Sequence, residues 1–340
     1  MGCFVHVYGG RKAHWAMFVL AFGAISKANA NFTVASDGSG NFKSVSQAVA
    51  AAPTHSPQPF TIYIKAGVYD EIVEVGSEKT NIVFIGDGID RTIITGNRSV
   101  AGGWSTFNTA TVGVEGARFM AQHMTFLNSA GQDKGQAVAF RIQSNQSTLY
   151  RCSFVGFQDT LYVKEGIQFF RECEIHGTVD FIFGNSAVVF QNCNLYARML
   201  NGNQPNVITA QGREDPTEKA GIVIQNCTTF AERDLSPSTK TYLGRPWREY
   251  SRTVIMQSFL DDFIDPTGWL RWNDTAPVDL LFYAEYQNRG HGAVTKDRVN
   301  WPGYKVLSNP SDAAVFTVSR FLKGDEWLPA TGVPYTGSLM

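Results

Sequence analysis

The segment Tyr150-Arg-Cys-Ser-Phe154 returns as Arg171-Glu-Cys-Glu-Ile175, as Gln191-Asn-Cys-Asn-Leu195 and as Gln225-Asn-Cys-Thr-Thr229. The first two steps between the central cysteines of these copies are almost equal in length, and the third step is longer. Apolar and polar residues alternate around the cysteines in short runs, a pattern that is typical of strands. A repeat of about 20 residues made of short strands predicts a solenoid, in which each repeat forms one coil and stacks on the next.

The residues within the repeat indicate which kind of solenoid to expect. A leucine-rich repeat would need a Leu-x-x-Leu-x-Leu pattern with Asn, which is absent. β-Branched residues, Phe and Cys instead converge on positions that suit the inward stack of a parallel β-helix, although a β-sandwich stays open as an alternative. We therefore expect an all-β fold, a right-handed parallel β-helix, in which the long third step holds a polar insertion around residues 201–205.

Two segments are candidates for the caps that an open-ended solenoid requires. Residues 44–53 are typical of a short helix with a Ser start and a Pro stop, and residues 311–322 are typical of a second one. We expect short capping helices at both ends of the β-helix. The domain should span residues 31–340 and include a helical or irregular C-terminal segment from about residue 310.

Residues 1–30 have the order of a secretory signal peptide: basic residues, an apolar run, then small residues at the cleavage position. The apolar run is too short for a comfortable membrane span, and a buried N-terminal helix is the alternative. We therefore expect a secreted protein without a membrane partner after cleavage. Five N-glycosylation sequons agree with a secreted glycoprotein; they begin at Asn31, Asn97, Asn145, Asn226 and Asn273.

The composition argues against two classes of function. The chain has 340 residues, 17% of them charged, and a formal net charge of −1, with no basic stripe. Nucleic acid is therefore not expected as a partner. The four cysteines after the signal have no metal-site spacing and the six histidines are scattered, so no metal is expected.

Asp159 and Asp180 are the first candidates for chemistry. Each follows the central cysteine of its own copy of the repeat by the same interval, so they lie one coil apart. Equivalent residues of adjacent coils lie about 4.8 Å apart, so the repeat forces two carboxylates together and one pKa should rise. Such a pair suits one nucleophile and one acid, whereas a ladder of solvated aspartates is the alternative.

Gln158 precedes Asp159 directly, and Gln136 lies close to one coil before Gln158. Two neutral amide donors beside two carboxylates suit the stabilisation of an oxyanion better than a metal, because metal sites want more carboxylates or histidines. Isolated glutamines are also common as surface polar residues, which is the other interpretation.

Several motifs resemble those of the pectin methylesterases, especially the plant type. The resemblance runs in family order from about residue 32 to the C-terminus. The motifs are Gly67-Val-Tyr-Asp-Glu71, Gly135-Gln-Ala-Val-Ala-Phe140, Gln158-Asp-Thr-Leu161, Asp180-Phe-Ile-Phe-Gly184 and Leu243-Gly-Arg-Pro-Trp247.

The resemblance implies catalytic roles for four residues. Asp180 would be the nucleophile, and Asp159 would be the proton donor and then the base. Gln158 and Gln136 would stabilise the oxyanion, and Gln136 would also contact the substrate.

The resemblance also implies substrate-binding residues. Arg245 would hold Asp180 ionised, because its planar fork suits a carboxylate, and would help to position the substrate. Trp247 would stack on a sugar ring, with a core tryptophan as the alternative. Thr106, in Trp104-Ser-Thr-Phe107, and Phe183 would line the same cleft.

The function that the resemblance implies is hydrolysis of the C6 methyl esters of pectin, that is, of methyl-esterified homogalacturonan, in the plant cell wall. No cofactor is required, the enzyme is expected to be a monomer, and a proteinaceous pectin methylesterase inhibitor is a candidate partner. Two other classes stay open: a retaining glycosidase, which also uses two close carboxylates, and a non-catalytic pectin-binding β-helix.

A disulfide between Cys193 and Cys227 is a further candidate, because some family members are understood to bridge the matching pair. Regular stacking would leave Cys152 and Cys173 as buried thiols, since strands about 4.8 Å apart exceed the Cβ separation of about 3.8 Å in a bridge.

The sequence also departs from the family pattern. After Val163 the plant pattern commonly has His and then Arg, where this chain has Lys164 and Ile167, and Arg271 stands where an acid is common. Lys164 and Ile167 follow Asp159, so we expect them to affect loop structure or substrate preference more than chemistry.

Overall fold

A computed structural model describes residues 26–202 and 204–340. The expected signal peptide, residues 1–30, lies outside the described residues as far as residue 25. In the described ranges no helix is long and apolar enough to cross a membrane.

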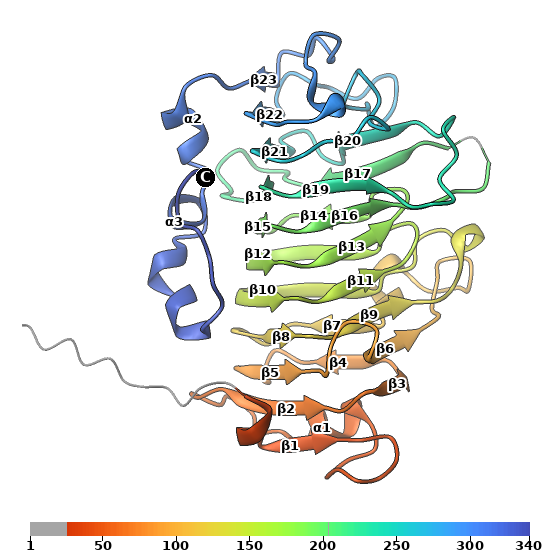
Figure 1. Ribbon diagram of the computed structural model, residues 1–340, viewed down its shortest axis with the longest axis vertical. Coiled ribbons are helices and arrows are strands. Elements are labelled where there is room, and N and C mark those ends of the chain that lie inside the picture. Colours follow the sequence, from red (N-terminus) through yellow and green to blue (C-terminus); the bar gives the residue numbers. More distant parts are fainter. Residues whose placement is uncertain (1–25, 203) are drawn as a thin grey trace, which may run out of the picture.

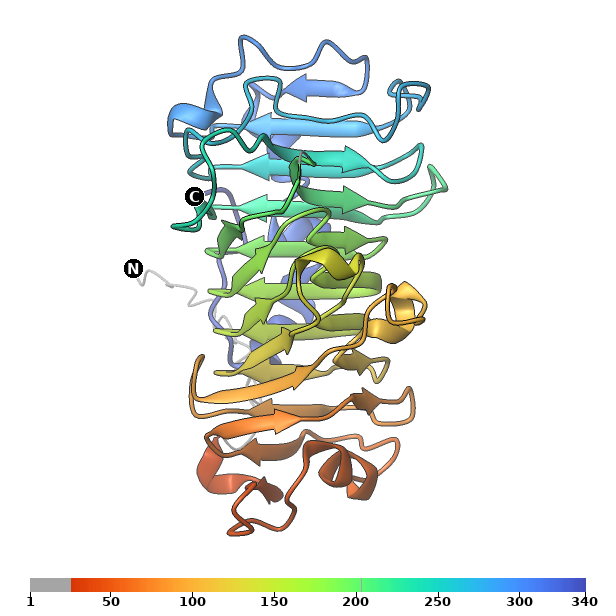
Figure 2. The same cartoon turned by 90° about the vertical axis from the view of Figure 1, so that its right-hand side faces the viewer.

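The chain forms a parallel β-helix, as the repeat predicts, and the coils stack along the long axis of the molecule (Figures 1 and 2). All pairings between its strands are parallel. One face of the stack consists of β1 (Phe32–Val34), β2 (Phe60–Ile64), β5 (Ile82–Ile85), β8 (Met120–Gln122), β10 (Phe140–Tyr150), β12 (Leu161–Arg171), β15 (Ala187–Gln191), β18 (Gly221–Gln225), β21 (Arg252–Met256), β22 (Phe282–Tyr286) and β23 (Tyr304–Val306).

Two further faces complete each coil. The second face continues the same sheet, because the 11-residue strands β10 and β12 extend into both faces; its other strands are β4 (Val73–Val75), β7 (Val112–Val114), β14 (Ile182–Gly184), β17 (Asn206–Gln211) and β20 (Thr241–Pro246). The third face is a separate sheet of β3 (Gly67–Asp70), β6 (Thr92–Gly96), β9 (Thr125–Asn128), β11 (Ser153–Val155), β13 (Glu174–Gly177), β16 (Asn194–Ala197) and β19 (Thr228–Ala231).

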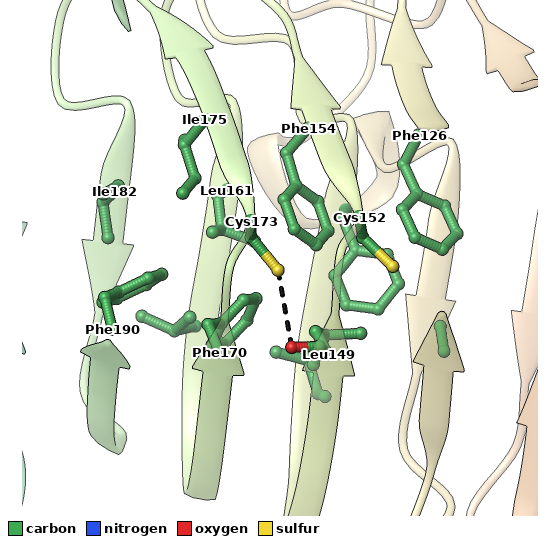
Figure 3. Close-up of a cluster of buried hydrophobic side chains, with 14 of the residues drawn as sticks. Phe126, Leu149, Cys152, Phe154, Leu161, Phe170, Cys173, Ile175, Ile182 and Phe190 are labelled. Carbon is green, nitrogen blue, oxygen red and sulfur yellow. Dashed lines mark hydrogen bonds between the residues drawn. The ribbon is translucent and has the colours of Figure 1, made fainter. Parts of the chain in front are cut away.

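The interior is filled by aromatic rings that repeat from coil to coil. Phe154 and Phe170 lie 5.5 Å apart between ring centroids, and Phe170 and Phe190 lie 4.6 Å apart. Figure 3 shows these rings pointing into the interior beside Cys152 and Cys173. The core therefore consists of columns of equivalent residues.

The cysteines form such a column, and all four in the described residues are free. The expected Cys193–Cys227 disulfide is wrong in this structure. The insertion leaves the register intact, because Gln191 pairs with Gln225 and Asn194 with Thr228 on either side of the pair. The Cys227 Sγ instead accepts a hydrogen bond from the Cys193 backbone N–H, 3.3 Å away.

The N-terminal helix α1 (Val45–Ala51) lies at the first coil, where it packs against β1 and β4. Ser44 caps it by accepting a hydrogen bond from the Gln47 N–H, and the Glu71 carboxylate accepts from the N–H groups of Val45 and Ser46 at 2.7 and 2.9 Å. Glu71, in the Gly67–Glu71 motif, therefore holds the helix against the stack.

The C-terminal helices differ from the expectation of a second end cap. Helices α2 (Pro310–Ala314) and α3 (Val318–Phe321) run along one side of the stack (Figures 1 and 2). Phe316 and Leu322 pack in one cluster with Val189 and Val223 on the outer side of the first face. The 3-10 turns are η1 (Lys27–Asn29), η2 (Thr106–Thr109), η3 (Gln132–Lys134), η4 (His291–Ala293), η5 (Gly324–Glu326) and η6 (Leu328–Thr331).

Candidate active site

Asp159 and Asp180 occupy equivalent places in adjacent coils, as their spacing predicts. Strand β12 pairs with β14 so that Leu161 lies opposite Ile182, and each aspartate is two residues before one member of that pair. Both aspartates are buried, with 7% and 4% of their surface exposed. The repeat thus places two carboxyl groups on the outer side of the second face.

Both aspartates adopt a left-handed backbone conformation, with φ of 64° at Asp159 and 53° at Asp180. Asp tolerates this region better than most residues, but the conformation still has a cost of roughly 1 kcal/mol or more. The neighbouring coil holds it in place: the Asp159 N–H donates to the Val179 carbonyl at 3.0 Å and the Leu161 N–H to the Phe181 carbonyl at 2.9 Å. Because of these turns, both carboxyl groups line a surface pocket, although the residues that flank Asp180 in the chain belong to the core.

Arg245, on β20, forms a two-pronged ion pair with Asp180. Its Nε donates to Oδ1 at 2.8 Å and its Nη2 donates to Oδ2 at 2.6 Å. The indole of Trp272 lies 4.2 Å from the guanidinium carbon. Within the described residues, no hydrogen bond reaches the Asp159 carboxyl group, so the two aspartates have very different surroundings.

The two carboxyl groups therefore ionise in a definite order. Burial, and then the negative charge of Asp180, raise the pKa of Asp159 well above its usual 3.8, against a smaller opposing effect of Arg245. Burial also raises the pKa of Asp180, but the Arg245 fork opposes that rise directly. Asp180 is thus the group that ionises first, and Asp159 is the one that keeps its proton.

These groups lie in a pocket of about 270 Å³. All eight site residues expected from the sequence line it; they are Thr106, Gln136, Gln158, Asp159, Asp180, Phe183, Arg245 and Trp247. The structure therefore brings these eight residues together from five coils, the first being Thr106 and the last Trp247.

Gln136 and Gln158 lie on adjacent coils, because the Ala137 N–H donates to the Gln158 carbonyl at 3.1 Å. Their side-chain amides make no hydrogen bond to any other described residue, although both residues line the pocket. Their N–H donors are therefore free to bind a ligand oxygen.

Aromatic rings form one wall of the pocket. Tyr162 stacks on Phe183 at 4.2 Å, and Trp247 lies 6.0 Å from Phe183 between ring centroids. Gly212 allows this position of the indole, since a Cβ on Gly212 would lie 2.6 Å from Cε3 of Trp247.

Four further residues line the pocket that were not expected from the sequence: Phe107, Tyr162, Ala210 and Trp272. Tyr162 could have been found from the coil period, because it lies one coil before Phe183 and pairs with it. Phe107 is the neighbour of Thr106. Ala210 and Trp272 offered no signal, since their positions depend on the insertion and on a distant loop.

The three departures from the family pattern fall in different places. Ile167 packs on the outer side of the first face, in the cluster that holds the C-terminal segment. Arg271 donates a hydrogen bond to the Ala276 carbonyl at 2.9 Å and lies in an exposed loop. Lys164 lies next to the pocket, with its Nζ 5.9 Å from the ring centroid of Phe107.

Comparison with known proteins gives a consistent family. Residues 31–325 match the family model Pectinesterase. The chain is 54% identical over 313 residues to Pectinesterase 2 of Citrus sinensis, covering 91% of this chain and 61% of that protein. It is also 54% identical over 307 residues to Pectinesterase/pectinesterase inhibitor PPE8B of Prunus persica, covering 89% of this chain and 59% of that protein.

The chain thus spans 61% and 59% of the lengths of these two curated relatives. Among solved structures, a pectin methylesterase from carrot superposes with a TM-score of 0.91 at 51% identity, which covers 92% of this chain and 99% of that one.

Proposed function

The chain belongs to the pectinesterase family, and on that premise we propose that it hydrolyses the C6 methyl esters of homogalacturonan to methanol and de-esterified pectate. The observation that carries the proposal is the pair of unlike carboxyl groups: Asp180, ion-paired with Arg245, beside the buried and unpaired Asp159. An ester hydrolysis needs one nucleophile and one proton donor, and the pair supplies both.

In the first step the Asp180 carboxylate attacks the C6 carbonyl carbon of a methylated galacturonate. The carbonyl oxygen becomes an oxyanion, and the free amide groups of Gln136 and Gln158 donate hydrogen bonds to it. A donor of this kind contributes about 3 kcal/mol to the transition state. The bond to the methoxy group then breaks, and Asp159 gives its proton to the departing oxygen, so that methanol leaves and an acyl-enzyme remains.

In the second step water attacks the acyl-enzyme. Asp159, now a carboxylate, removes a proton from the water, and the bond between the sugar carbonyl and Asp180 breaks. The products are a galacturonate carboxylic acid, which then ionises, and Asp180 back in its pair with Arg245. Each turnover therefore consumes one water and one ester and restores both aspartates.

The aromatic wall supports a sugar polymer as the substrate. Tyr162, Phe183 and Trp247 offer ring surface next to the aspartates, and Trp272 covers the Arg245 side. Flat apolar sugar faces pack well on such rings. Secretion to the cell wall and binding of a proteinaceous inhibitor are predictions that accompany this function.

One assay tests the proposal. The purified protein is incubated with highly methylated pectin, and released methanol and new reducing ends are measured in the same sample. We expect methanol without new reducing ends. New reducing ends would instead indicate a glycosidase, and the absence of both products would indicate a binding protein.

A further inference from the structure

The pairing of β10 with β12 contains an irregularity beside the pocket. Ile142 pairs with Val163, but the next residue, Gln143, pairs with Glu165. Lys164 is therefore an extra residue on β12 without a partner on β10, which is a β-bulge. Bulges change the direction of a side chain and are frequent next to active sites.

The bulge places Lys164 at the edge of the pocket. Tyr162, two residues earlier on β12, lines the pocket, and so does Phe107. The Lys164 Nζ lies 5.9 Å from the Phe107 ring centroid, and its side chain is 29% exposed. A polymer that extends from the aspartates over Phe107 would therefore pass within reach of this ammonium group.

A second cation contacts the same ring, but its charge is already neutralised. The Arg141 guanidinium lies 3.6 Å from the Phe107 centroid, is 2% exposed, and forms ion pairs with Glu74 at 2.8 Å and Glu115 at 3.3 Å.

Lys164, by contrast, forms a single ion pair within the described residues, with Glu165. The Glu165 carboxylate lies 3.7 Å away on a side chain that is 60% exposed. An exposed pair of this kind is weak. Of the two cations at Phe107, Lys164 is thus the one that can bind an anionic ligand.

We propose that Lys164 determines substrate specificity by binding the free carboxylate of a galacturonate close to the ester under attack. This inference rests on the proposed function. Methylated galacturonate units are neutral at C6, whereas each turnover creates one carboxylate. The enzyme then acts faster on pectin that is already partly de-esterified than on fully methylated pectin.

The test compares Lys164→Met with a matched control, Lys305→Met. Lys305 is an exposed lysine on β23 whose Nζ lies 5.4 Å from the Phe282 ring, so it has a similar environment away from the pocket. Methanol release gives kcat/KM on fully methylated and on half de-esterified homogalacturonan. The loss of a surface ion pair of ordinary strength corresponds to a change of about threefold to fivefold in kcat/KM.

We expect Lys164→Met to lower kcat/KM about threefold to fivefold on the half de-esterified polymer and to leave kcat/KM on the fully methylated polymer unchanged. Lys164→Arg and Lys305→Met should have the same kcat/KM as wild type on both polymers. High salt should remove the wild-type preference, because it screens exposed charges. Equal losses on both polymers, or no loss on either, would overturn the proposal.

A separate measurement keeps the two proposals apart. Calorimetric titration with fully de-esterified homogalacturonan should show weaker binding by Lys164→Met than by wild type, and equal binding would refute the role of Lys164. If wild type released no methanol from either polymer, the proposed function would fail, while this titration would still decide whether Lys164 binds carboxylates.

Discussion

At the residue scale, Asp159 and Asp180 have the same coil position and similar burial but different partners. Arg245 pairs with Asp180 through two hydrogen bonds, and no described residue does the same for Asp159. The proposed division into nucleophile and acid thus depends on one arginine that is 65 residues from Asp180 in the chain. The repeat alone placed the two carboxyl groups together, but it could not say which one would ionise first.

We expect a bell-shaped dependence of kcat/KM on pH. The proposed mechanism requires Asp180 ionised and Asp159 protonated, and burial raises the pKa of both groups above 3.8. Activity should therefore rise as pH increases through the lower apparent pKa of the pair and fall as pH passes the higher one. Rates of methanol release from about pH 4 to about pH 9 measure this, and a rate that does not change across the range would contradict it.

Asp159→Asn should abolish activity and stabilise the fold. Because the folded pKa of Asp159 is raised, the native state keeps a proton that the unfolded chain releases above 3.8. The free energy of unfolding of wild type therefore falls as pH rises from 3.8 through the pKa of Asp159 in the folded protein. Asparagine has no proton to lose, so at neutral pH the variant should gain about 1 kcal/mol or more in the free energy of unfolding.

Urea unfolding of both proteins at acidic and neutral pH measures this difference, with the exposed Asp133→Asn as the control. A variant less stable than wild type at neutral pH would show that the Asp159 carboxylate is stabilised by a partner.

At the element scale, the left-handed turns and the bulge matter most for the site. Both aspartates lie in such turns, and Lys164 lies in the bulge. The sequence contains no local sign of either feature, because Asp and Lys are common in many conformations. Both depend on hydrogen bonds to the next coil, so single-residue preferences could not predict them. The strands themselves were predictable, because the cysteine-centred segments repeat.

The cap at the first coil gives a prediction at this scale. The two carboxylate oxygens of Glu71 accept hydrogen bonds from two N–H groups at the start of α1. Glu71→Gln therefore loses the negative charge and one of the two acceptor oxygens. Charged caps contribute about 1 kcal/mol, and we expect Glu71→Gln to lower the free energy of unfolding by that amount without changing the pH profile of activity.

Asp70→Asn, at the exposed neighbouring position, is the control for charge alone. Equal stability of the two variants would show that Glu71 does not hold the helix.

At the scale of the whole molecule, the β-helix and eight of the twelve pocket-lining residues followed from the sequence, whereas the course of the C-terminal segment did not. One signal was present: Ala187-Val-Val-Phe190 is apolar at consecutive positions, so both sides of that strand had to be buried. Phe190 and Val188 face the interior, and Val189 faces the C-terminal segment. The sequence could show that the outer side was covered, but not which segment covered it.

The central claim is that the pocket hydrolyses methyl esters through Asp180. The most direct test measures methanol released from methylated pectin by wild type and by Asp180→Asn at equal concentration, after melting curves have shown that both are folded. We predict that wild type releases methanol in proportion to new carboxylates, and that the folded variant releases less than about one thousandth as much. Methanol release by folded Asp180→Asn at a rate close to wild type would contradict the claim.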